Sequence, residues 1–426
     1  MIKNLSILFF LCISTTLLYA QDTLRLSRAE SEALFLKENL QLLAEEINIS
    51  QAEAQVIQAK LWPNPELSIE EVNLWKKGNE DFAPPISGSF GKNQQFSIEV
   101  EQLIITAGKR KKQIALEVIN VEQAKHYFED VLRNLKIEFR SQLTKLQYLQ
   151  RSKSIYQEQY KSISQLAKGM QNQVNQGFVS RSDYIRLKAE ELSFLKEVNT
   201  LNQDLNAAQK ELKQLMHLAP TTRLHITEEG YLKNRKAIEN LALKDLASIA
   251  QKNRPDLELA DLEKEYAEQS YSFEKAQRIP DIALKAGYDR AGGVIPDFIG
   301  FGLSIDLPIF DRNQGHIKIA EQDIQKADLL QRQKLRGIEN EITMVYDNLQ
   351  QALAFYQNIS DDYEAHLDTL LKAHTKNFKD KNINLLTYLD FLEAYLNNKI
   401  IMLEAVKTLN DKAETLNYTL GTDLIK

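Results

Sequence analysis

Residues 100–115, VEQLIITAGKRKKQIA, align without a gap on residues 305–320, IDLPIFDRNQGHIKIA, at an offset of 205 residues. The same offset places Ser182 on Thr387, Ala189 on Ala394 and Leu215 on Leu420. A register held over roughly a hundred residues is typical of a chain built from two copies of one long unit. We therefore expect a first repeat over residues 21–218, a linker over 219–244 and a second repeat over 245–426.

Long helices are predicted by the positions of the prolines. None of the nine prolines lies between residues 86 and 219 or between 309 and 426, and a proline inside a helix costs about 3 kcal/mol. Apolar residues in both stretches recur at spacings of three and four, which indicates amphipathic helices. We expect long helices over 109–173 and 315–376. At 1.5 Å per residue each spans roughly 90 Å, which predicts an elongated molecule.

Each long helix is followed by a break and a return helix, predicted over 181–217 and 384–420. Gly177 in the first break suits the left-handed conformation that ends a helix, and Asn382 takes its place in the second. The two copies therefore contain two helical hairpins of matched length. Further helices are expected at the N-terminus, ending near Trp62, and over 245–278.

Strands are predicted by alternation of apolar and polar residues. Period-two segments occupy residues 65–105 and 281–308, and each contains two strands joined by a loop, at 76–93 and 291–297. Ten residues is the length that a tilted strand needs to cross a bilayer. A soluble hairpin packed on a helix fits the same pattern. Export and the aromatic residues near the strand ends favour the membrane interpretation.

The N-terminus has the pattern of a secretory signal peptide over residues 1–20, with one positive charge, a short apolar core and Ala20 before a polar start. The only cysteine, Cys12, lies inside this segment in a poor context for lipid attachment, so we expect neither a lipid anchor nor disulfides in the mature protein. The formal net charge of −6 argues against a nucleic-acid partner.

Four strands are too few to close a barrel. Their unpaired edge N–H and C=O groups would each cost several kcal/mol in hydrocarbon. If the strands enter a membrane, several copies of the chain must contribute them to one closed sheet, whose polar face then lines a shared lumen.

The chain resembles the TolC-like outer-membrane efflux proteins, especially the branch that works with metal- and drug-exporting RND pumps. The resemblance covers the mature chain and rests on the tandem halves, the proline-marked strand pairs, residues 308–315 (PIFDRNQG) and the hairpin tips. It implies a mainly α protomer with a small β part that trimerises into a twelve-stranded outer-membrane barrel, continued by an α-helical tunnel through the periplasm. It also implies a periplasmic adaptor and an inner-membrane RND-type transporter as partners.

The resemblance implies a gate where the tunnel closes. The family pattern Asp-Val-Leu-Asp-Ala matches residues 390–394, so Asp390 and Glu393 are the expected gate carboxylates, on one helix face because they are three residues apart. A solvated helix face is the alternative. Asp183 matches a family aspartate that helps to hold the closed state. The family's basic partner is replaced by Leu386, and Arg181 or Arg186 could substitute for it.

The hairpin tips are the expected contacts with the adaptor. The residues concerned are Gly177, Phe178, Ser182, Asn382, Ile383 and Thr387. Exposed apolar side chains such as Phe178 and Ile383 are costly unless a partner covers them.

We expect no enzyme, no cofactor and no metal site. The six histidines show no ligand spacing with cysteine or carboxylates, and neither a phosphate loop nor a catalytic triad is identifiable. The leading hypothesis is a passive exit duct in the outer membrane. The alternatives are a periplasmic adaptor or scaffold, which would carry one hairpin flanked by β-rich domains, and a hydrolase of the cell envelope, which the absent active-site pattern disfavours.

Overall fold

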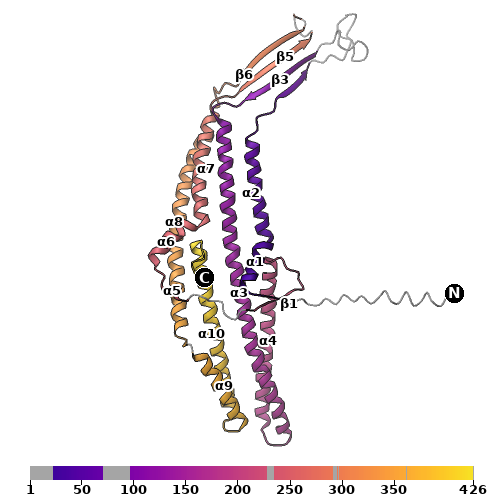
Figure 1. The fold of residues 1–426 in the computed structure, drawn as a ribbon, viewed down its shortest axis with the longest axis vertical. Coiled ribbons are helices and arrows are strands. Elements are labelled where there is room, and N and C mark those ends of the chain that lie inside the picture. The colour runs from indigo at the N-terminus through magenta and orange to yellow at the C-terminus, as the bar shows by residue number, and fades with distance from the viewer. Residues whose placement is uncertain are drawn as a thin grey trace, which may run out of the picture. The chain divides into compact units, whose positions relative to one another are not determined.

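A computed structural model describes residues 23–70, 96–227, 235–290, 295, 297–360 and 362–425, which are mainly helical (Figure 1). They form two compact units. The first contains the chain up to Ala44 with Asp130–Arg254 and Ile338–Lys426, and the second contains Glu45–Glu129 and Pro255–Gly337. Each unit therefore takes a part from each sequence repeat, and the units cut across the predicted division into 21–218 and 245–426.

The second unit contains an antiparallel sheet of four strands in the order β2-β3-β5-β6 (Figure 1). Two strands come from the segment predicted at 65–105 and two from the segment predicted at 281–308. The rest of the first predicted pair, residues 71–95, lies outside the described residues. The strands are β2 (Glu66–Glu70), β3 (Phe96–Ile104), β5 (Ile282–Arg290) and β6 (Phe298–Ile305).

This sheet has one apolar and one polar face, as its period-two pattern predicts. One row across the strands is Leu67, Val100, Ala286 and Phe301, and the adjacent row is Glu66, Glu101, Lys285 and Gly302. Neighbouring rows point to opposite faces. Most large side chains of the apolar face are exposed. On the polar face the Lys285 ammonium contacts the Glu99 and Glu101 carboxylates at 3.0 and 2.8 Å.

Both copies pass from strand to helix through a left-handed residue directly before the helix. Gly108 has φ 66° directly before α3 (Lys109–Asn175), and Asn313 has φ 58° directly before α8 (Gln314–Gln357). These two left-handed residues are separated by the repeat offset of 205, so the sequence repeat is also a structural one at this turn. The helices that precede the strand pairs are α2 (Leu40–Ala59) and α7 (Pro255–Gln277).

The first unit contains two helical hairpins. In one, α4 (Arg181–Leu215) returns along α3. In the other, α10 (Leu385–Leu420) returns along α9 (Tyr363–Lys379) (Figure 1). The four helices share one cluster of buried apolar side chains, to which each of them contributes. Among the described residues, no helix has both the length and the apolar character needed to span a bilayer.

The prediction of one helix over 315–376 is wrong, because α8 ends at Gln357 and α9 begins at Tyr363. The amides of Asn358 and Ile359 donate to carbonyls three residues back, at 3.2 and 3.1 Å, which is the tight last turn of a fraying helix. Ser360 and Asp362 follow, and such short polar residues favour helix ends. The break contains no proline and so was missed.

Two other predicted helices are also divided. The one at 245–278 is α6 (Leu243–Asn253) followed by α7, because Pro255 disfavours a helical conformation at Arg254, which is extended with φ −87° and ψ 116°. The N-terminal one is α1 (Arg28–Glu38) followed by α2. Asn39 separates them: its side chain donates to the Leu215 carbonyl at 2.8 Å and accepts from the Leu42 amide at 3.0 Å.

The segment 219–244 was predicted to be irregular, and this is wrong for its described residues. It contains β4 (Arg223–Ile226), which pairs in parallel with β1 (Thr23–Leu26), and α5 (Arg235–Glu239). Leu224 and Ile226 are buried while their neighbours are exposed. Two alternating residues are too short a pattern to identify a strand from sequence alone.

Candidate functional site

The tip of the first hairpin is a capped turn. Gly177 has φ 78°, and the Phe178 amide donates to the Gln173 carbonyl at 2.9 Å, which closes the end of α3. The Ser180 hydroxyl accepts from the Asp183 amide at 3.0 Å and starts α4. Asp183, an expected gate residue, accepts the Ser180 hydroxyl proton at 2.8 Å. Its carboxylate therefore takes part in the cap.

The tip of the second hairpin repeats this geometry with different residues. Lys381 has φ 63°, and Asn384 caps α10 by accepting from the Thr387 amide at 2.8 Å. The expectation that Asn382 replaces Gly177 in the left-handed position is therefore wrong. Cap Ser180 corresponds to cap Asn384, an offset of 204 rather than 205. Thr387 is accordingly the structural equivalent of Asp183 and not of Ser182.

Exposed apolar side chains differ between the tips. Phe178 is 72% exposed at the first tip, as expected. Ile383 is only half exposed and packs against the buried cluster, so the expectation of an exposed Ile383 is wrong. Leu386, which stands where the family has a basic residue, is exposed instead. Ser182 and Asn382 are exposed at their tips.

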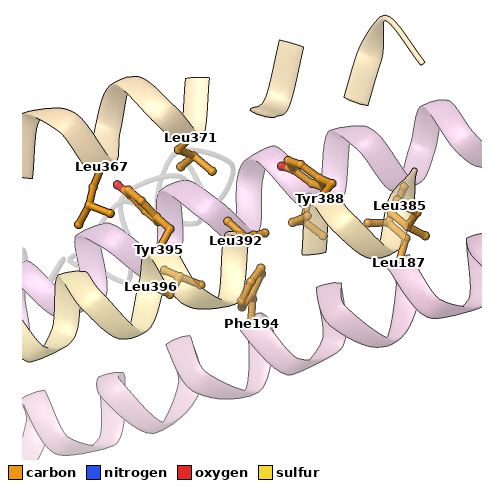
Figure 2. Packing of buried hydrophobic residues seen from close by; sticks show 11 residues of the cluster. Leu187, Phe194, Leu367, Leu371, Leu385, Tyr388, Leu392, Tyr395 and Leu396 are labelled. Atoms are coloured by element: carbon orange, nitrogen blue, oxygen red, sulfur yellow. The ribbon is translucent and has the colours of Figure 1, made fainter. Parts of the chain in front are cut away.

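Behind the tips, the buried cluster fixes the positions of the helices. Figure 2 shows side chains of α4, α9 and α10 converging, with Leu187 and Phe194 from α4. Tyr388 is fully buried at the level of the tips and stacks on Phe378 of α9, with ring centroids 4.9 Å apart. A close-packed core of this kind holds the polar side chains on its rim in defined places.

The expected gate carboxylates lie on the rim of this core. Asp390 and Glu393 are both exposed on α10, next to buried Leu392. Within the described part of the chain, neither carboxylate has a hydrogen-bond or ion-pair partner in the same protomer. Both carboxylates are therefore free, as far as the described residues go, to interact with groups outside the protomer.

A third carboxylate, Glu190 on α4, was missed by the sequence analysis. Burial raises the pKa of Glu190, and the negative charge of Glu393 raises it further. Glu190 of the first hairpin is therefore close enough to Glu393 of the second hairpin to respond to its charge. The available signal was its position on the buried stripe of α4, three residues after Leu187 and four before Phe194.

Arg181 and Arg186, which were considered as replacements for the missing basic residue, are both exposed. In the described residues of this chain, neither side chain makes an ion pair. A latch through either arginine therefore stays a prediction.

A buried cation joins the two helices of the second hairpin. The Lys399 ammonium of α10 contacts Glu364 and Asp368 of α9, both at 2.8 Å, and the Lys399 side chain is 8% exposed. The Tyr395 hydroxyl donates to Asp368 at 2.9 Å. Burial acts to raise the pKa of Asp368, but the hydrogen bonds from Lys399 and Tyr395 outweigh it and lower that pKa. We call these four residues the Lys399 clasp.

Metal ligation finds no support among the residues whose structure is described, since no three histidine, cysteine, aspartate or glutamate side chains gather there. Two histidines have polar contacts of another kind. His126 lies 2.9 Å from a Glu129 oxygen, and His225 lies 3.2 Å from the Gln150 amide.

Comparison with known proteins adds relatives of similar length. The cobalt-zinc-cadmium resistance protein CzcC of Cupriavidus metallidurans is 24% identical over 412 residues, covering 94% of this chain and 91% of CzcC. The CmeC outer membrane channel of Campylobacter jejuni has the same fold, with a TM-score of 0.73 at 14% identity, over 93% of this chain and 85% of CmeC. The outer membrane protein VceC of Vibrio cholerae matches with a TM-score of 0.68 at 17% identity, over 93% and 97% of the two chains.

The family model that describes outer membrane efflux proteins matches residues 33–216 and 246–422, one match for each repeat. These ranges contain both strand pairs, both hairpins and the carboxylates near the tips. The chain belongs to the outer membrane efflux protein family.

Proposed function

We propose that the chain is the passive exit duct of a tripartite efflux system and works as a homotrimer. As a family member it lies in the outer membrane, with its helices in the periplasm. In this proposal an inner-membrane transporter of the RND type supplies the energy, and an adaptor connects it to the hairpin tips. The duct binds no cofactor and catalyses no reaction.

One observation carries the proposal. The sheet β2-β3-β5-β6 has an exposed apolar face and two outer strands with one neighbour each. Open edges cannot remain unpaired in hydrocarbon. Pairing β6 of one copy with β2 of the next closes the sheet without edges. Three copies contribute twelve strands, a number that places the polar face around a water-filled lumen.

The experiment that tests the trimer is membrane fractionation followed by crosslinking across the proposed junction. Cysteines placed at Leu67 and Leu303 lie on the outer strands β2 and β6. In the outer-membrane fraction they should crosslink into trimers. A pair on the inner strands, at Val100 and Ala286, should crosslink only within one chain. A soluble periplasmic monomer would support the adaptor alternative instead.

The gate belongs to the same proposal. Asp390 and Glu393, repeated three times around a narrow opening, would focus a negative potential and favour cations. Glu190 supports the assignment because it responds to the charge of Glu393. Asp183 contributes by fixing the first tip rather than by facing the opening.

Replacing Asp390 and Glu393 together with alanine should increase the conductance of the trimer in planar bilayers and reduce its selectivity for cations. Glu404→Ala on the same helix is the control. It also removes a carboxylate from α10, but one that accepts a hydrogen bond from Tyr148 of α3 and is not part of the proposed gate. Unchanged conductance and unchanged cation selectivity in the double variant would remove the gate.

We further propose that the cargo is cationic. In the described strands, the polar face of the sheet carries Glu66, Glu70, Glu99, Glu101 and Asp289, with Lys285 as its one cation. A wall with this excess of negative charge favours cations in the lumen. The relative CzcC is named for resistance to cobalt, zinc and cadmium, which is consistent with this charge. Deleting the chain should lower the metal tolerance of its host. If the variant Asp390→Ala/Glu393→Ala restores tolerance to the deletion strain, the two carboxylates are needed for closing the duct but not for transport through it.

A further inference from the structure

The segment between β6 and α8 exposes apolar side chains directly after the sheet. Phe310 is 92% exposed, and Leu307 and Ile309 are also exposed. An isolated apolar side chain on a surface is ordinary, but three within four residues form a patch that points to a binding surface.

This segment is held in place, so the exposure of Phe310 is part of its fold. The Asn313 amide donates to Asp311 at 2.9 Å, and the Arg312 amide donates to Gln314 at 2.8 Å. The Asn313 side chain donates to the Glu274 carbonyl of α7 at 2.9 Å. These bonds fix both the turn and its attachment to α7, and they leave Phe310 without cover from its own chain.

Three cations line a pocket beside the exposed ring. A shallow pocket of about 710 Å³ is lined by Arg278, Arg312 and Lys318 together with Ile309 and Phe310. Glu321 is the only carboxylate in this lining, and it pairs with Lys318 at 2.7 Å. The guanidinium of Arg278 has no hydrogen-bond or ion-pair partner among the described residues. The pocket therefore has an excess of positive charge carried by two arginines.

The position of the pocket in the fold fits a membrane boundary. Leu307 and Phe310 continue the chain from β6, whose side chains Ile299, Phe301, Leu303 and Ile305 are exposed on the apolar face. All four helices attached to the sheet join it at this end. An apolar surface that passes into arginine and lysine is the pattern of a protein surface at the level of lipid headgroups.

We propose that Arg278 and Arg312 bind the phosphate of an anionic phospholipid in the periplasmic leaflet, while Phe310 and Ile309 enter its acyl region. This inference rests on the proposed function, because it requires the apolar face of the sheet to lie in the membrane. Arginine suits the role since its planar fork of donors matches phosphate oxygens. The pocket then anchors each copy of the chain at a fixed depth.

The test uses the full-length trimer in nanodiscs of phosphatidylcholine mixed with phosphatidylglycerol. Native mass spectrometry after release from the discs counts the lipids of each class that remain bound. The variant is Arg278→Gln/Arg312→Gln. The matched control is Lys244→Gln/Lys252→Gln, which removes the same charge from exposed positions in the other compact unit.

The wild type and the control should retain phosphatidylglycerol in preference to phosphatidylcholine. The double variant should lose roughly fivefold of this preference for each cation removed, and so roughly 25-fold in total. Arg278→Gln alone breaks no side-chain hydrogen bond or ion pair within the described residues, so its roughly fivefold loss can be measured even if the double variant folds poorly.

Equal retention of the two lipids by the wild type would overturn the inference. A preference for phosphatidylglycerol that survives in Arg278→Gln and in Arg278→Gln/Arg312→Gln would overturn it as well. If instead Arg278→Gln breaks the trimer into monomers in detergent without lipid, the pocket is an interface between copies of this chain, and the inference is again overturned. Failure of the proposed function is seen separately, because the wild type would then show no trimer mass in any disc.

Discussion

The two hairpins come from one repeat but are held together differently. In the first hairpin the outgoing helix α3 is unbroken from Lys109 to Asn175. In the second, the corresponding stretch is divided into α8 and α9, and α9 has only 17 residues. The first hairpin therefore inherits its direction from a long helix, whereas the second must be positioned by contacts near its tip.

The buried charges of the two hairpins reflect this difference. Glu191 in α4 pairs with Lys188 of the same helix at 2.5 Å, so this ion pair stays within α4. Its link to α3 is weaker: a hydrogen bond with Ser164 and the more distant charge of Lys168 help to lower the pKa of Glu191. The Lys399 clasp instead connects α10 to the start of α9, directly after the break between α8 and α9. We infer that this ion pair between α9 and α10 substitutes for helix continuity in the second hairpin, where the expected gate residues Asp390 and Glu393 also lie.

The largest expected effect comes from the core at the second tip. Tyr388→Ala removes a fully buried ring that stacks on Phe378 of α9, and a change of this kind costs about 3 to 5 kcal/mol. Hydrogen exchange of the solubilised protein should show α9 losing protection first, since no continuous helix supports it. Phe194→Ala removes a comparable ring from α4 and should leave α3 protected.

Phe178→Ala is the control for these substitutions, because a side chain that is 72% exposed contributes little to the core. Equal loss of protection in α3 and α9 after Tyr388→Ala would contradict the comparison. The two hairpins would then respond as one body, and helix continuity would not matter.

The fold could be predicted from sequence where local chemistry alone decides it. Gly108 and the aligned Asn313 turn the chain into α3 and α8, and both starts follow from the repeat register. The break after Gln357 could not be predicted in this way. Its residues Asn358 and Ser360 are tolerated in many helices, and whether they end one depends on tertiary packing.

The candidate site was predictable to a similar degree. Spacing alone placed Asp390 and Glu393 on one helix face. Their relation to Glu190 depends on how α4 lies beside α10, which no spacing within one helix reveals. Ile383 was expected to be exposed because it lies in a turn, but it packs against the buried cluster and is partly buried.

The clasp itself can be removed with Lys399→Met, which keeps most of the side-chain volume. Glu364 and Asp368 are partly exposed and can be hydrated once the cation is lost, so we expect a cost of about 1 to 2 kcal/mol, below that of a fully buried pair. Limited proteolysis should cut near residues 358–362 faster. Lys407→Met is the matched control, because Lys407 pairs with Asp411 inside α10, and equal cleavage of both variants would argue against the clasp.

Acid should weaken the second hairpin through the clasp. The folded-state pKa of Asp368 lies below its ordinary value of 3.8, so the clasp contributes fully above that pH and loses strength as the pH falls through the folded pKa. Burial also opposes the charge of Lys399, but its carboxylate partners raise its pKa, so the clasp persists in base up to at least the ordinary 10.5 of lysine. We expect an effect smaller than that of Lys399→Met.

Hydrogen exchange of α9 compared between pH 7 and pH 3, corrected for the intrinsic rate, measures this loss. Asp368→Asn should remove the pH dependence in α9. Asp423 elsewhere in the first unit also loses stabilisation in acid, because hydrogen bonds from Arg140 and Lys136 outweigh burial and lower its pKa to about 2. Asp368→Asn leaves that contribution unchanged and so separates the two. A pH dependence in α9 that survives Asp368→Asn would assign it to another group.

The smallest effect distinguishes the turns. Gly177 takes a left-handed conformation at the first tip without a side chain, whereas Lys381 takes it at the second with φ 63°, which costs a residue with a Cβ about 1 to 2 kcal/mol. Lys381→Gly should relieve that strain, but glycine also gives the unfolded chain more conformational entropy, which offsets part of the gain. The free energy of unfolding should therefore rise by a net of about 0.5 to 1 kcal/mol. The thermal unfolding midpoint of the solubilised trimer should rise slightly, while Lys379→Gly, at the last position of α9, should lower it. If Lys381→Gly also lowers the unfolding midpoint, the Lys381 side chain stabilises the second tip by more than its backbone strain costs. The two turns would then share a backbone shape but not the source of their stability.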